Sequence, residues 1–157
     1  MLELKDEFTE KRAILENART VLKSEFIGID KIIDEVIDNV SSWYILSDIQ
    51  EKPIVINLWG LTGVGKTSMV SRLVELINFK NKYFRFDLGE KTGMFSFRQS
   101  ISELCENSGT SPIIIAWDEF QHSRTVTGPF REEKDTDNNR MVWELVDSGI
   151  IQHVEWK

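Results

Sequence analysis

The chain has 157 residues, of which 41% are hydrophobic and 29% charged, and its formal net charge is -7. These values are typical of one globular domain or part of one, and without a basic stripe they argue against nucleic acid as the main partner. No apolar run approaches the ~20 residues that cross a bilayer, and the charged N-terminus is no signal peptide. We therefore expect a cytoplasmic protein with no membrane partner.

Two helices are expected before the first strand. Residues 3–24 are dense in Glu, Lys and Arg and carry apolar residues at helical spacing, which predicts an amphipathic helix. We treat residues 1–23 as an N-terminal segment of their own. After a break at Gly28, isoleucines and valines at helical spacing predict a second helix over 29–40.

A glycine-rich segment follows the β-branched run Ile54, Val55 and Ile56 and precedes an amphipathic stretch over 68–77. Its residues fill the pattern G-x-x-x-x-G-K-[ST]: Gly60, Leu61, Thr62, Gly63, Val64, Gly65, Lys66 and Thr67. We therefore predict a strand, a tight turn and a helix. Backbone N–H groups of this loop and of Ser68, the helix N-terminus and the Lys66 ammonium would bind phosphates. The alternative is a glycine loop that matches by chance.

Strands and helices alternate through the rest of the chain. We expect strands over 83–88 and 112–118, the second buried on both faces of a parallel sheet, and helices over 96–105 and 139–146. The polar residues 121–137 are expected to form a mobile loop. This alternation predicts an α/β fold with a parallel sheet flanked by helices.

Two acidic residues end the second of these strands. Ligand chemistry gathers at the carboxyl ends of parallel strands, so Asp118 and Glu119 should face the phosphate loop. Asp118 and the Thr67 hydroxyl are candidates to hold Mg²⁺, and Glu119 is a candidate to polarise water for hydrolysis. The alternative is that the two acids merely lead the strand into a solvated loop.

The phosphate loop with Lys66 and Thr67, together with Asp118 and Glu119, resembles the Walker A and Walker B motifs of AAA+ ATPases. Residues 24–30 resemble the short N-terminal box of that family. The resemblance implies that Phe26, Ile27 and Ile29 pack on the adenine of ATP. The alternative for this segment is a simple helix junction.

Two further segments are similar to Clp-type unfoldases, namely residues 84–88 and residues 142–149. In that clade an aromatic residue on a loop before Walker B grips polypeptide, and Phe95 falls near this place. The chain lacks the longer segment found there, and Phe95 could instead begin a helix.

The resemblance implies a three-layer P-loop NTPase fold with N-terminal helices. The resemblance covers roughly residues 24–150. We assign residues 24–157 to an ATPase core that stops before the sensor-1 strand, the arginine finger and the lid. In this family a later strand lies between the Walker B strand and the phosphate-loop strand. We therefore expect the N-terminal part of a longer protein, with weak ATP hydrolysis by this part alone and a homo-oligomeric ring formed through the missing parts.

The leading functional hypothesis is Mg²⁺-dependent ATP hydrolysis, with Glu119 and Lys66 as catalytic residues and ADP as product. Oligomerisation would couple it to remodelling of a protein or another macromolecule. The alternative is a nucleotide-dependent assembly switch in signalling or antiviral defence, in which slow hydrolysis acts as a timer. A small-molecule kinase is less favoured, because Glu119 indicates water as the nucleophile.

Overall fold

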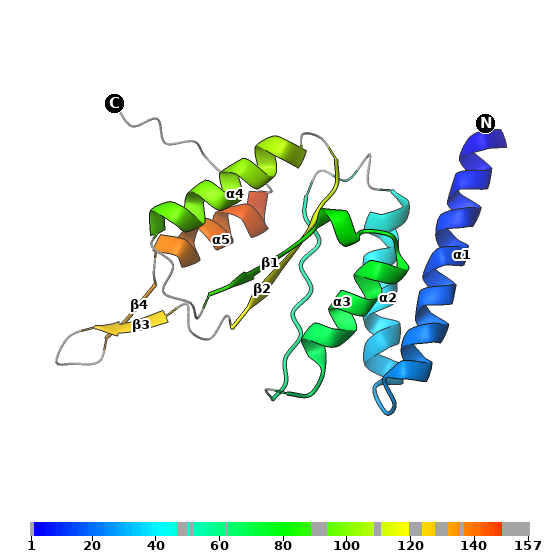
Figure 1. Cartoon of the computed structure of the whole chain (residues 1–157), viewed down its shortest axis with the longest axis horizontal. Helices are drawn as coiled ribbons and strands as arrows, with labels where there is room; N and C mark the ends of the chain where they lie inside the picture. Colours follow the sequence, from blue (N-terminus) through cyan, green and yellow to red (C-terminus); the bar gives the residue numbers. More distant parts are fainter. Residues whose placement is uncertain are drawn as a thin grey trace. The chain divides into compact units, whose positions relative to one another are not determined.

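The computed structural model describes most of the chain. The described residues are 2–46, 50, 52–61, 63–88, 94–108, 111–119, 124–127, 132–135 and 137–148. They belong to two compact units, one made of residues 1–50 and 54–81 and the other of residues 51–53 and 82–157. Figure 1 labels their helices and strands. No helix within the described residues has both the length and the apolar character needed to cross a membrane.

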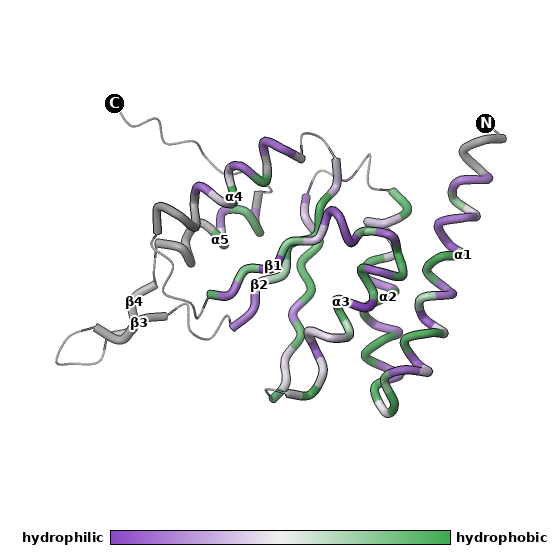
Figure 2. The backbone as a smooth tube through the Cα atoms, in the orientation of Figure 1, coloured by the Kyte–Doolittle hydropathy of each residue, from purple (hydrophilic) through white to green (hydrophobic). Residues whose placement is uncertain are grey.

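The first unit contains the helices α1 (Leu2–Glu25), α2 (Asp30–Ile45) and α3 (Lys66–Leu76), and α1 packs against both of the others (Figure 1). All three helices were predicted from apolar spacing, and all three are confirmed. Their buried side chains form the core of this unit: Leu15, Ala18, Leu22, Ile33, Val36, Ile37, Tyr44, Met69, Leu73, Val74 and Ile77. Figure 2 shows apolar and polar residues alternating along α1 and α2, as amphipathic helices require.

Charged side chains join α1 to α2 at the edge of this core. The Arg19 guanidinium donates to Asp34 Oδ1 and to Asp38 Oδ1, each over 2.6 Å. The Lys23 ammonium donates to the other Asp34 oxygen over 2.8 Å. The aspartates that the sequence spaces along one face of α2 therefore meet cations of α1, which offsets their mutual repulsion.

The second unit contains a parallel pair of strands, β1 (Tyr83–Asp87) and β2 (Ile114–Asp118). Their register runs from Tyr83 opposite Ile114 to Asp87 opposite Asp118. Both strands were predicted and are confirmed. The 3-10 turn η2 (Lys80–Lys82) precedes β1.

Helices α4 (Met94–Ser108) and α5 (Asp137–Ser148) complete the core of the second unit. Ile101 and Val142 are buried between them, and partly buried residues of both strands pack against this pair. Among these residues, Phe86 and Trp117 stack with ring centroids 5.4 Å apart. Because side chains alternate between the faces of a sheet, Phe86 and Trp117 define the face that α4 and α5 cover. The two predicted helices are confirmed.

Three expectations are corrected. The expected strand at Ile54–Ile56 is not formed, because a strand requires hydrogen bonds to a neighbour and no described strand pairs with residues 53–61. All residues of β2 are half-buried rather than fully buried, since β1 is its one neighbour among the described strands. The third correction concerns residues 121–137.

Two strands lie where a mobile loop was expected. β3 (Arg124–Thr127) and β4 (Glu132–Asp135) pair as an antiparallel sheet, with Arg124 opposite Asp135. Residues 125–127 are all β-branched, and such residues favour extended backbone. The strands were not predicted because most residues of the segment are polar.

Candidate functional site

The phosphate-loop segment ends at the first turn of α3. Gly63 and Gly65 have φ angles of 83° and 87°, and Gly65 is the N-cap of the helix. A glycine N-cap brings no side-chain oxygen to the first-turn N–H groups, so these donors remain suited to an anion. Two glycines of the segment thus have left-handed backbone, and it ends at a helix N-terminus, where anions can bind.

The Lys66 side chain turns back over this loop. Its ammonium donates to the carbonyl oxygens of Gly60 and Leu61, both over 2.8 Å. The Lys66 ammonium therefore lies against the backbone of the loop, and its contact with phosphate stays a prediction.

The ring of Phe26 lies beside Gly65. A Cβ atom at Gly65 would stand 3.9 Å from Phe26 Cε1. Phe26 follows directly after α1, and its N–H donates to Leu22 O over 2.8 Å. A residue from the predicted N-terminal box therefore lies close to the phosphate loop within one compact unit.

An ion pair holds the end of α1 against α3. The Arg72 guanidinium donates to both carboxylate oxygens of Glu25, with Nε to Oε2 at 2.9 Å and Nη2 to Oε1 at 2.8 Å. Hydrogen bonds from Arg72 lower the pKa of Glu25. This bidentate contact fixes the orientation of the guanidinium against the carboxylate, and it positions the neighbouring Phe26.

The other predicted ligands of this unit differ in exposure. Ile27 is 83% exposed, whereas Ile29 is half-buried at the N-cap of α2. Leu61, Val64 and Ser68 are exposed, and Thr67 is half-buried in the first turn of α3. Thr62 lies outside the described residues. Of the three residues expected at adenine, Phe26 lies close to Gly65 of the loop.

Asp118 ends β2 in the second unit, and its carboxylate is engaged at both oxygens. Oδ2 accepts from Arg85 Nη2 in a close ion pair, and Oδ1 accepts from the Glu119 N–H over 3.0 Å. The Asp118 carbonyl accepts from the N–H of Leu88 over 3.0 Å. This carboxylate therefore already attracts a cation at the end of the sheet.

Glu119 has a left-handed backbone, with φ at 53°. A residue with a Cβ pays about 1–2 kcal/mol for this conformation. Strain of this kind clusters at functional sites, where the surrounding structure enforces it. The hydrogen bond from its N–H to Asp118 Oδ1 links the two predicted acids directly.

The two residues predicted to bind Mg²⁺ carry the type of donor atom that this ion prefers. Thr67 and Asp118 offer a hydroxyl and a carboxylate, and Mg²⁺ takes oxygen ligands, keeping several waters and using few carboxylates. The described residues include no group of three or more His, Cys, Asp or Glu that could hold a metal by themselves. Thr67 belongs to the first unit and Asp118 to the second, so their use by one ion stays a prediction.

Arg85 was not identified from the sequence. A long side chain can reach the residue diagonally opposite on the neighbouring strand, because both lie on the same face of the sheet. The sequence could indicate such a pair only if the register of β1 against β2 were known. Phe95 lies in the first turn of α4, so its backbone adopts the helical alternative.

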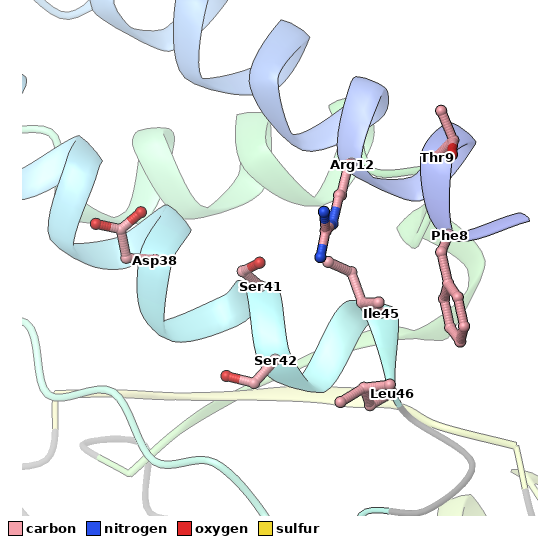
Figure 3. Close-up of a pocket in the computed structure, with 8 residues that line it drawn as sticks. All are labelled: Phe8, Thr9, Arg12, Asp38, Ser41, Ser42, Ile45 and Leu46. Carbon is pink, nitrogen blue, oxygen red and sulfur yellow. The ribbon is translucent and has the colours of Figure 1, made fainter. Parts of the chain in front are cut away.

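The first unit also has a hollow of about 620 Å³ between α1 and α2 (Figure 3). Its lining residues are Phe8, Thr9, Arg12, Asp38, Ser41, Ser42, Ile45 and Leu46. None of them belongs to the predicted nucleotide site. The hollow is therefore distinct from that site.

The sequence is similar to part of one curated protein. Over 75 residues, or 48% of this chain, it is 35% identical to Lon protease of Clostridium beijerinckii. The matched segment spans 9% of that protein's length. No protein-family model matches the chain, and no solved structure matches it significantly.

Proposed function

We propose that this chain binds ATP with Mg²⁺ at the phosphate loop and hydrolyses it, as part of an AAA+ module with a three-layer P-loop fold. Oligomerisation would couple hydrolysis to remodelling of a macromolecule. The observation that carries the proposal is the loop before α3, where glycine N-cap, helix N-terminus and Lys66 ammonium coincide.

The pairing of strands agrees with the proposed fold. β2, the strand that ends in Asp118, pairs in parallel with β1, and an α/β fold is built on a parallel sheet. Similarity to a Lon protease over 75 residues supports an AAA+ module in general and no particular clade of that family.

Each site residue has a defined task in this proposal. The loop N–H groups and Lys66 bind the phosphates, and Phe26 packs on adenine. Bound Mg²⁺ would neutralise charge on the phosphate oxygens. Glu119 accepts a proton from the attacking water, for which its place beside Asp118 is suitable.

The direct test is Lys66→Ala, with nucleotide affinity measured by titration calorimetry of ADP and of a non-hydrolysable ATP analogue. We expect binding to be abolished or nearly so, whereas Lys80→Ala, on the turn after α3, should bind as the wild type does. Unchanged affinity in Lys66→Ala would refute the proposal.

Hydrolysis is tested separately with Glu119→Gln. This change keeps the size of the side chain and removes its basicity, so ATP binding should persist while phosphate release falls to background. Normal phosphate release by this variant would assign the task of polarising water to another residue.

A further inference from the structure

We propose that the hollow between α1 and α2 binds a small monocarboxylate with an apolar body, whose carboxylate group pairs with Arg12. This inference concerns two helices of the first unit and does not depend on nucleotide binding. The hollow has a volume of about 620 Å³, which lies within the range of roughly 300–1,000 Å³ for small-molecule sites. It is therefore large enough for such a ligand.

Arg12 supplies the positive charge of the hollow. The other two arginines of the first unit are neutralised, because Arg19 pairs with three carboxylates and Arg72 with two. No ion pair joins Arg12 to any residue that the structure describes. Figure 3 shows the Arg12 side chain extending from α1 toward α2. The lining thus contains a guanidinium that no described carboxylate neutralises.

The lining also contains one carboxylate, that of Asp38. Asp38 Oδ1 accepts from Arg19 Nη2 over 2.6 Å. Because this ion pair offsets the charge of Asp38, the lining keeps the single positive charge of Arg12. One negative charge on the ligand would balance it.

The C-terminal end of α2 favours a carboxylate over a phosphate group. Ile45, the last residue of α2, belongs to the lining. A helix C-terminus carries about half a negative charge, which repels a phosphate dianion more strongly than a monoanion. A carboxylate also matches the planar Arg12 guanidinium, because it accepts two parallel N–H···O hydrogen bonds. These two effects select a monocarboxylate.

The rest of the lining suits a ligand with one polar end and an apolar body. Ser41 and Ser42 lie one turn before Ile45 on α2, and their hydroxyls can donate to a carboxylate. Phe8 on α1 and Ile45 on α2 are half-buried, and Leu46 is 41% exposed. An apolar ligand body would remove this surface from water.

The test is titration of the whole chain with 3-phenylpropionate, followed by NMR of the backbone amides. We expect shifts to cluster in residues 8–12 and 38–46, with half-saturation at millimolar concentrations, as suits a ligand of this size. 3-Phenylpropionamide lacks the charge and phenyl phosphate carries two charges, so both should bind more weakly.

Arg12→Gln should raise the dissociation constant of 3-phenylpropionate by about two- to fivefold, the factor that an exposed ion pair contributes. Lys31→Gln is the matched control. It loses an equal charge from a side chain that is 91% exposed and lies outside the lining, so it should leave the dissociation constant unchanged. Circular dichroism checks that both variants are folded.

Equal affinity of the wild type and Arg12→Gln overturns the inference. Shifts scattered over the chain, or no shifts at all in the wild type, overturn it without any variant. Equal binding of the amide would remove the role of the charge, and tighter binding of phenyl phosphate would overturn the choice of a monocarboxylate.

Discussion

The aromatic ring of Phe26 lies beside Gly65, the residue at which the phosphate loop becomes a helix. The two residues are far apart in sequence, and the contact depends on the end of α1 reaching α3. The Glu25–Arg72 ion pair secures that approach. A flat apolar ring next to an anion-binding helix end is a suitable surface for the base of a nucleotide.

Phe26→Ala should therefore weaken ADP binding. An aromatic contact contributes about 0.5–1.5 kcal/mol beyond its buried area, so we expect a loss of at least about threefold in affinity. Phe8→Ala is the matched control, because Phe8 is also half-buried but lines the separate hollow between α1 and α2. Equal losses from both variants would indicate general destabilisation rather than contact with the base.

Gly65→Ala and Gly28→Ala separate backbone strain from binding. Both glycines have φ at 87°, where alanine costs about 1–2 kcal/mol, so both variants should lower the free energy of unfolding by a similar amount. Gly65 alone belongs to the phosphate loop. We therefore expect ADP affinity to fall in Gly65→Ala and to persist in Gly28→Ala, as measured by calorimetry well below the unfolding temperature. Equal affinities would argue against a phosphate role for the N-cap of α3.

Glu119→Gly should stabilise the protein while ending hydrolysis. Glycine removes the left-handed strain of about 1–2 kcal/mol, and its greater unfolded-state entropy cancels about 0.4–1 kcal/mol of this gain. Glu119→Gln loses the same carboxylate but keeps the strain. The glycine variant should thus unfold at the higher temperature of the two, and the reverse order would show that Glu119 is not strained.

Acid should weaken the packing of α1 on α2. Hydrogen bonds from Lys23 and Arg19 lower the pKa of Asp34 below its ordinary value near 4. A carboxylate with a lowered folded pKa stabilises the fold above its unfolded pKa, and this contribution is lost as the pH falls through the folded pKa. We therefore expect the unfolding temperature to fall as the pH is lowered from about 5 to below the ordinary aspartate pKa near 4.

Asp34→Asn tests the assignment. It should lower the unfolding temperature at neutral pH and reduce the further fall in acid. Glu35→Gln is the control, since Glu35 is exposed and its ion pair with Lys31 is long, at 3.8 Å. If both variants keep the full acid dependence, other carboxylates are responsible for it.

The local elements could be predicted from sequence patterns. Apolar residues at helical spacing predicted α1, α2, α3, α4 and α5, because a helix buries one face whatever its partner is. The phosphate-loop pattern predicted the positions of Gly65 and Lys66, because the conformation of a glycine and the start of a helix are local properties. The acidic end of β2 was also evident from an apolar run that stops at Asp118.

Which of these elements meet depends on tertiary contacts. The register of β1 against β2 brings Arg85 to Asp118, and the Glu25–Arg72 pair brings Phe26 to Gly65. Strand formation likewise depends on a neighbour, so Ile54–Ile56 has strand propensity but forms no strand. Residues 124–127 and 132–135 pair as antiparallel strands, which their polar composition did not indicate. Pairing and register join residues distant in sequence, so they depend on tertiary contacts as well as on the pattern of each strand.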